Sequence, residues 1–146
     1  MYIKHGVTVF SQRDLYSLDY QLKDILCHAL KRLREASEDR EGVPMSVLPD
    51  LPVGVYSHSE EQLEEGHKKY LEVLDKMIYA FDRTTEPQMD EYNFDFRWKH
   101  YDGRRIGVEC TDVEEFQRYK DDLSDWQEKC LEGRLLFAEH FDSLYL

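Results

Sequence analysis

The chain has 146 residues, which is enough for one domain with a sizeable core. Its formal charge of −12 opposes binding to long nucleic acid, whose phosphates would be repelled. No apolar run is long enough to span a membrane, and residues 1–10 lack the apolar stretch of a secretory signal, so we expect a cytoplasmic protein without a membrane partner.

The N-terminal part contains one strong helical pattern. Residues 1–10 carry several apolar side chains around Gly6 and predict a short strand or an extended arm. Apolar residues at three- and four-residue steps then predict a helix over residues 14–37. This stripe consists of Leu15, Leu18, Leu22, Ile25, Leu26, Ala29, Leu30 and Leu33.

A proline-rich loop separates this helix from the next. Pro44, Pro49 and Pro52 each remove a backbone donor and restrict the preceding residue, which predicts a loop over residues 42–57. The loop also carries many apolar side chains, so we expect it to pack on the core or on a partner.

A second helix is predicted over residues 59–84. Ser59 and Gln62 have the spacing of a capping box, in which each side chain accepts a hydrogen bond from the other residue's backbone. A second apolar stripe follows, and Thr84, Thr85 and Pro87 predict the end of the helix.

The C-terminal third is helical on one face. Thr111 and Glu114 again have the spacing of a capping box. Glycine inside a helix costs roughly 1 kcal/mol relative to alanine, so we expect Gly133 to divide this part into helices 111–132 and 134–144. With a hairpin at about residues 91–109, the predicted fold class is mainly α: a three- or four-helix bundle with one β-hairpin, in a single domain of residues 1–146.

The segment of residues 91–109 has the two-residue period of a strand with two distinct faces. Aromatic residues alternate with polar ones up to Asp102-Gly103, a dipeptide that favours a tight two-residue turn. Ile106 and Val108 supply the returning strand.

The same segment gathers positive charge and flat rings. Four cations and one aspartate give residues 97–105 a formal charge of +3, so the rest of the chain carries −15. Arginine presents a planar donor fork that suits phosphate, and aromatic rings stack on bases. The hairpin therefore indicates a site for a small anionic, nucleotide-like ligand, in which Trp98 and Tyr101 stack and the cations contact phosphate. The candidate site residues are Arg97, Trp98, Lys99, His100, Tyr101, Arg104 and Arg105.

Other interpretations of these features stay open. The hairpin can be structural, with Phe94, Phe96 and Trp98 packed on the helices while its cations pair with the acidic surface. The acidic helix surfaces can imitate DNA phosphates and occupy a nucleic-acid-binding protein. The same acidic residues also suit a solvated helix face that needs no further function.

Nothing in the sequence nominates catalysis, so we expect no enzymatic activity. The six histidines have neither the HExxH pattern nor a zinc spacing, and we expect no metal or cofactor. The chain contains neither a phosphate-binding glycine loop nor a GxSxG nucleophile motif. Cys27, Cys110 and Cys130 lack a CxxC spacing and are expected to be reduced thiols.

Three stretches of the chain resemble a known family. They are YSLDYQLKDILCHALKRLRE followed by GVP, then EVLDKMIYAFD, and finally EGRLLFAEHFDSLYL at the end of the chain. These stretches are similar to a family of small, acidic, mainly helical proteins encoded by tailed bacteriophages. The resemblance implies a protein of the infected bacterial cytoplasm that binds and disables a host component, and it brings no catalytic residues.

We therefore predict a non-enzymatic phage-type protein that sequesters a nucleotide-like signal of host defence. The alternative is an acidic protein-protein inhibitor or DNA mimic that binds and blocks a host protein. The apolar proline loop and the large number of aromatic residues also predict a homo-oligomer, most simply a dimer.

Overall fold

The computed structural model describes residues 2–4, 7–9, 17–38 and 43–144. The chain divides into two compact units, one of Met1–Arg83 with Cys130–Leu146 and the other of Thr84–Lys129. Its described part is mainly helical with an antiparallel hairpin, which confirms the predicted fold class. The single domain of residues 1–146 stays a prediction, which a single unfolding transition would support.

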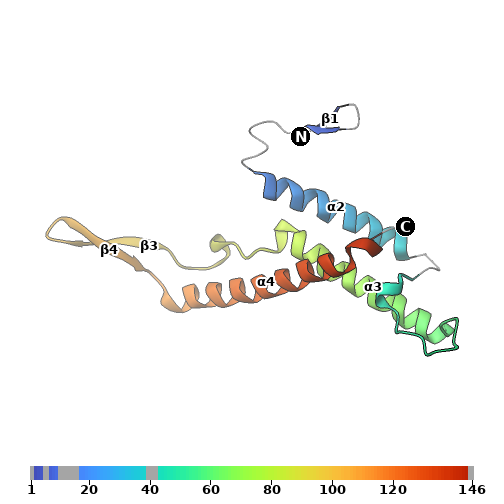
Figure 1. The fold of residues 1–146 in the computed structure, drawn as a ribbon. Coiled ribbons are helices and arrows are strands. Elements are labelled where there is room, and N and C mark those ends of the chain that lie inside the picture. The colour runs from blue at the N-terminus through green and yellow to red at the C-terminus, as the bar shows by residue number, and fades with distance from the viewer. Residues whose placement is uncertain (1, 5–6, 10–16, 39–42, 145–146) are drawn as a thin grey trace. The chain divides into compact units, whose positions relative to one another are not determined.

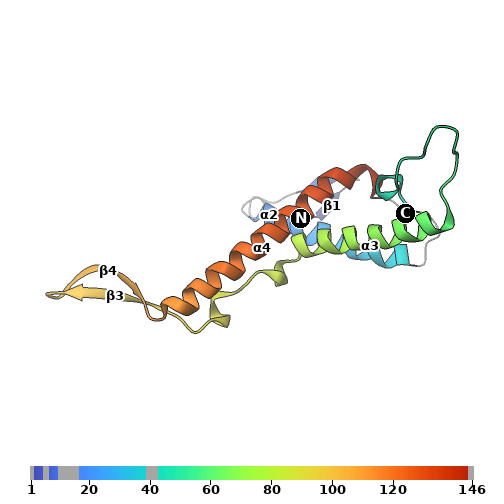
Figure 2. The ribbon, with the colours of Figure 1, turned by 90° about the horizontal axis from the view of Figure 1, so that it is seen from below.

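The first unit is built around helices α2 (Leu18–Glu38) and α3 (Glu60–Phe81), which pack against each other (Figures 1 and 2). Helix α3 supplies most of its core, while the stripe predicted for α2 contributes only in part: Leu30 is buried, Leu26 and Leu33 are partly buried, and Leu22, Ile25 and Ala29 are exposed. The buried cluster consists of Cys27, Leu30, Val47, Tyr70, Val73, Leu74, Met77 and Phe81. Helix α2 matches the prediction of 14–37 at its C-terminal end within one residue, while residues 14–16 lie outside the described part of the chain.

Helix α3 begins as predicted and ends earlier. The Ser59 hydroxyl accepts from the Gln62 backbone N–H at 3.2 Å, and the Gln62 side chain accepts from the Ser59 N–H at 2.9 Å, which confirms the capping box. The predicted end at residue 84 is wrong by three residues, because Asp82 adopts an extended conformation with ψ 112°. Its carboxylate accepts a hydrogen bond from Lys31 of α2 at 2.7 Å, and Arg83–Thr85 form a separate 3-10 turn, η2.

Helix α4 (Val113–His140) contributes residues to both units and runs unbroken through Gly133, so the predicted division into helices 111–132 and 134–144 is wrong. A short 3-10 turn, η4 (Phe141–Ser143), follows it. The reason is tertiary: a Cβ atom at Gly133 would collide with the Lys76 carbonyl oxygen and lie 2.6 Å from the Ala80 Cβ. Glycine is needed there for close packing of α4 on α3, and the packing compensates its poor helix propensity.

The proline loop packs on the core only in part. Its 3-10 turn η1 (Met45–Val47) places Val47 in the core, where it is 4% exposed. In contrast, Met45 is 69% exposed, and Val53 and Tyr56 are almost fully exposed. The prediction that the loop packs on the core is therefore confirmed at Val47, and the alternative that its other apolar side chains contact a partner stays a prediction.

The N-terminal residues form a short antiparallel pair of strands, β1 (Tyr2–Lys4) and β2 (Val7–Val9). The sequence predicts a strand or an extended arm here, and the second strand was not foreseen. The part of the chain that the structure describes thus contains two separate two-stranded sheets.

The second unit comprises η3 (Met89–Glu91), strands β3 (Phe96–Tyr101) and β4 (Arg104–Cys110), and the first turns of α4. The predicted hairpin of residues 91–109 therefore starts too early. The strand cannot extend further back because its partner ends at Cys110, shortly before α4 begins. Beneath the hairpin the rings of Phe94 and Phe96 both meet Phe116 edge-on, with centroids 5.2 and 5.3 Å apart.

The N-terminus of α4 is capped differently from the prediction. The Asp112 carboxylate accepts hydrogen bonds from the backbone N–H groups of Glu114 at 3.1 Å and Glu115 at 3.0 Å. The Thr111 hydroxyl instead accepts from the Asp95 N–H at 2.8 Å, and the Thr111 N–H donates to the Asp95 carbonyl at 2.9 Å. Thr111 thus closes the base of the hairpin, and the predicted capping box with Glu114 is wrong.

None of the helices in the described ranges combines the length and the apolar character that crossing a membrane requires.

One hydrogen bond of the second unit predicts a titration. The Tyr92 hydroxyl donates to the Asp122 carboxylate at 2.7 Å, which raises the pKa of Tyr92 to about 12 from its ordinary value of 10.0. Only the protonated phenol can donate, so this bond stabilises the fold below pH 10 and is lost as the pH rises through about 12. We expect ¹³C NMR of labelled tyrosine rings to show Tyr92 titrating near 12, and Asp122→Asn to lower its pKa. A Tyr92 that titrates near 10 in the wild-type protein would contradict the contact.

Candidate functional site

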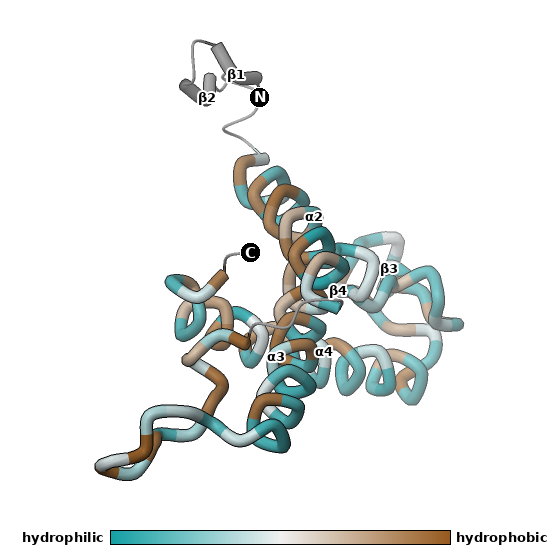
Figure 3. Tube along the Cα trace, turned by 90° about the vertical axis from the view of Figure 1, so that its right-hand side faces the viewer, coloured by the Kyte–Doolittle hydropathy of each residue, from teal (hydrophilic) through white to brown (hydrophobic). Residues whose placement is uncertain are grey.

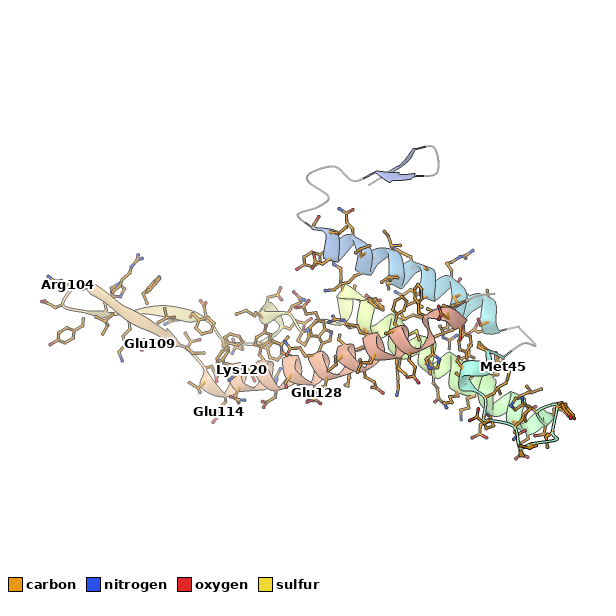
Figure 4. The ribbon with its side chains drawn as sticks, in the orientation of Figure 1. Met45, Arg104, Glu109, Glu114, Lys120 and Glu128 are labelled. Atoms are coloured by element: carbon orange, nitrogen blue, oxygen red, sulfur yellow. The ribbon has the colours of Figure 1, made fainter. Side chains whose placement is uncertain are left out.

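The candidate site lies on the hairpin of β3 and β4, and its turn forms as the sequence predicts. Asp102 and Gly103 both have positive φ, 48° and 73°, the backbone sign that a type I′ turn requires at its two central positions. Asp102 is the one described residue other than glycine with positive φ. Figure 4 shows Arg104 just after this turn and Glu109 nearer the base of the hairpin.

A β-bulge shifts the register of the two strands. Tyr101 pairs with Arg104 and His100 with Arg105, but Lys99 pairs with Gly107, so Ile106 is an extra residue on β4. Bulges strengthen the local twist, and a glycine inside a strand is a common sign of one. The bulge brings Val108 opposite Trp98, whereas an unbroken ladder from the turn would place Gly107 there.

The register divides the seven candidate residues between two faces. Directly opposite residues of an antiparallel pair point to the same side, and successive residues alternate. We call one side the basic face; it consists of Arg97, Lys99, Tyr101, Arg104, Gly107 and Glu109. We call the other side the aromatic face; it consists of Phe96, Trp98, His100, Arg105, Val108 and Cys110. One small ligand on one face cannot contact all seven candidates, and the sequence pattern alone did not separate Arg105 from the other three cations.

The aromatic face is exposed beyond the base of the hairpin. Phe94 and Phe96 pack on Phe116, as the structural interpretation of the hairpin predicts. Trp98 does not pack on the helices: it is 55% exposed, and the Arg105 guanidinium lies over its ring, 4.9 Å from the centroid. This cation–π contact orders the Arg105 side chain against its own strand pair.

Among the residues that the structure describes, the cations of the basic face have no acidic partner. Elsewhere in the described chain six basic side chains form ion pairs with carboxylates; they are Lys31, Arg32, Arg34, Lys76, Arg83 and Arg118. Within that same part of the chain, Arg97, Lys99 and Arg104 form none, although Glu109 stands directly opposite Arg97. The prediction that these cations serve to neutralise the acidic surface therefore fails for the basic face.

The basic face offers a ring as well as charge. Tyr101 is 74% exposed and stands opposite Arg104, at the end of the hairpin next to the turn. A phenol ring beside unpaired guanidinium groups can stack on a flat ligand while the guanidiniums bind its anionic groups. The sequence pattern did not nominate Glu109, the acidic residue of this face, because only the shifted register reveals its position.

The described residues give no sign of metal or thiol chemistry. They contain no group of three His, Cys, Asp or Glu side chains placed to hold a metal ion. Burial raises the pKa of the Cys27 thiol, which disfavours the reactive thiolate. Cys27, Cys110 and Cys130 form no disulfide with one another. The groups that the hairpin presents are exposed cations and rings.

Comparison of the chain with protein-family models, with curated proteins and with solved structures gives no significant match.

Proposed function

We propose that this is a binding protein without catalytic activity, and that the basic face of the hairpin holds an anionic, nucleotide-like ligand. The observation that carries the proposal is that Arg97, Lys99 and Arg104 share one face and have no carboxylate partner among the described residues, in a chain with 31 acidic and 19 basic residues. Six basic residues elsewhere in the described chain pair with carboxylates, and six others, Lys23, Lys68, Lys69, Lys120, Lys129 and Arg134, form no ion pair with a described carboxylate. The basic face differs from these because its three cations share one face with the exposed ring of Tyr101, an arrangement that favours an external anion.

The spacing of the basic face suits a ligand with more than one phosphate. Alternate residues on a strand lie about 7 Å apart, so Arg97, Lys99 and Tyr101 span about 13 Å along β3. Phosphates at two of these positions would leave the exposed ring of Tyr101 to stack on a base, a contact worth roughly 1–3 kcal/mol. Dinucleotides and cyclic oligonucleotides have this combination of groups.

In the cell, the ligand we propose is a nucleotide signal of host defence, which the protein would sequester. This step depends on the resemblance to acidic, mainly helical phage proteins, which implies a protein of the infected bacterial cytoplasm. Sequestration needs affinity and abundance only, so it requires no catalytic group, metal or cofactor.

Isothermal titration calorimetry tests the proposal with the full chain, its fold verified by circular dichroism. The probes are cyclic di- and trinucleotides, adenine dinucleotides, and tripolyphosphate as an anion without a base. We expect the nucleotides to bind more tightly than tripolyphosphate, and added salt to weaken binding because the face is open to solvent. Absence of heat with every nucleotide would refute the proposal, and equal affinity for tripolyphosphate would reduce the site to an anion site.

A second candidate function is blockade of a host protein, and the exposed proline loop favours it. Met45, Val53 and Tyr56 expose apolar surface on one short loop, as protein-binding segments do. A host protein retained at one-to-one stoichiometry after Arg97→Glu with Arg104→Glu, and lost after Tyr56→Ala with Val53→Asp, would favour this function. The opposite pattern would favour the hairpin.

A further inference from the structure

Part of the apolar stripe predicted for helix α2 lies outside the core that α2 forms with α3. Leu22 and Ile25 are 44% and 40% exposed, and Ala29 and Ala36 are exposed as well. With Arg32, these residues follow one another at steps of three and four, which is the a/d spacing of a helix–helix seam. Hydrophobic positions recur along the whole of α2 (Figure 3).

One flank of this stripe is a groove. Leu26 and Leu33 of α2 form one wall, and Phe137, Phe141 and Leu144 at the end of the chain form the other. The groove has a volume of about 540 Å³, and Phe141 is 61% exposed at its edge. Arg32 is the one charged residue that lines it. An apolar groove beside an exposed apolar seam leaves a continuous surface without a cover among the described residues.

The other flank of the stripe is polar. Gln21, His28 and Glu35 follow one another at seven-residue steps along that side of α2. The surface therefore changes character across the helix, from the polar flank to the apolar seam and then to the apolar groove. This asymmetry decides in which orientation a partner helix can pack on α2.

We propose that the partner is a second copy of this chain, with the two α2 helices antiparallel about a two-fold axis perpendicular to them. Such an axis brings each flank against the same flank of the other copy. The groove of one copy then packs on the groove of the other, and the two polar flanks lie next to each other. In a parallel pair, Leu26 and Leu33 would instead face the polar flank of the second copy.

The antiparallel seam also matches side-chain sizes. In a seam where a positions meet d positions, Ile25 of one copy lies opposite Ala29 of the other, and Leu18 lies opposite Ala36. These two pairs each combine a large and a small side chain, which keeps the helices close without overpacking. The same register places Leu22 opposite Arg32, whose aliphatic stem can cover Leu22 while the guanidinium stays in solvent. The contact covers 18 residue steps of helix, about 27 Å at 1.5 Å per residue. The dimer contact involves residues of the first unit only, so it is independent of ligand binding at the hairpin.

Light scattering after size exclusion tests the dimer on the full chain. We expect a mass of twice 17.5 kDa for the wild type at micromolar concentration. Ala29→Glu would place a carboxylate in the seam and raise the dissociation constant ~100-fold or more, giving monomers. Ala138→Glu makes the same change at an exposed helical alanine outside the groove, so it controls for fold and charge and should stay dimeric. A monomeric wild type, or a dimer that Ala29→Glu leaves intact, would overturn the proposal.

Disulfide crosslinking tests whether the two α2 helices are antiparallel or parallel. In a Cys110→Ser background, His28→Cys should form a disulfide-linked dimer on mild oxidation, because the two copies of residue 28 lie near the axis. Leu22→Cys should not form this disulfide, since its two copies would lie about 15 Å apart along the helix. A disulfide through residue 22 but not through residue 28 would indicate a parallel pair and refute the arrangement.

Deletion of Tyr145–Leu146 tests a different occupant of the groove. If the wild type is monomeric and the deletion makes it dimerise, the chain's own end occupies the groove and the proposal is wrong.

Discussion

Replacing Gly133 by alanine is expected to lower the free energy of unfolding of the first unit by about 2 kcal/mol or more, the scale of overpacking in a close-packed core. Alanine has the better helix propensity by about 1 kcal/mol, so the substitution would stabilise an uncrowded helix. Here its methyl group meets the Lys76 carbonyl and the Ala80 Cβ of α3. The Lys76 carbonyl belongs to the backbone of a helix and cannot rotate away from this methyl group. Helix α4 must therefore separate from α3, which loosens the edge-on contact of Phe137 with Phe81.

Urea denaturation followed by circular dichroism measures this effect, and two other glycines give matched controls. A Cβ at Gly107 would have nothing within 4 Å, so Gly107→Ala should change stability by less than about 0.5 kcal/mol. A Cβ at Gly66 would meet the end of the Leu48 side chain at 2.5 Å, and that side chain can rotate, so the cost should fall well below that at Gly133. Unchanged or increased stability of Gly133→Ala would contradict the close packing of the two helices.

The double substitution Arg97→Gln with Arg104→Gln is expected to weaken nucleotide binding ~100-fold or more, since a hydrogen bond to a charged group contributes roughly 1.5–3 kcal/mol. Both side chains lie on the basic face and lack an acidic partner within the described residues. Glutamine keeps a polar side chain of similar length, so the exposed hairpin should still fold. Calorimetry with the tightest of the nucleotide probes gives the ratio of dissociation constants.

Arg105→Gln is the control for that experiment, because it removes the same charge from the opposite face. Arg105 stacks on Trp98 and shares no face with the other three cations. We expect it to change the affinity less than about threefold, a shift of under 1 kcal/mol. An effect as large as that of the double substitution would mean that the ligand responds to the total charge of the hairpin, and the division into two faces would have no functional meaning.

The sequence predicted those features that depend on neighbours along the chain. The apolar stripes of α2 and α3, the Ser59 capping box and the Asp102-Gly103 turn all depend on residues within a few positions of one another. The alternation of aromatic and polar residues likewise predicted a two-faced strand, and the basic and aromatic faces of the hairpin follow from it.

The features that the sequence did not predict depend on contacts between distant residues. Gly133 is a helix breaker by propensity, but it lies where α4 meets α3, and only the packed structure shows that contact. Thr111 suits a helix cap, yet Asp95, which directly precedes β3, donates a hydrogen bond to it, and capping is left to Asp112. Gly107 was the one local sign of the bulge that determines which cations share a face.

The hairpin has a further consequence for solubility, since both of its outer edges are open: β3 and β4 pair with each other and with no other described strand. Open edges invite pairing with strands of neighbouring molecules, and exposed Ile106 and Val108 would favour such stacking. Lysine and arginine at an edge, together with a bulge that twists it, are the features by which proteins discourage this. The cations proposed to bind a ligand would thus also keep the ribbon from polymerising, and variants that neutralise all of them should be the first to form fibres.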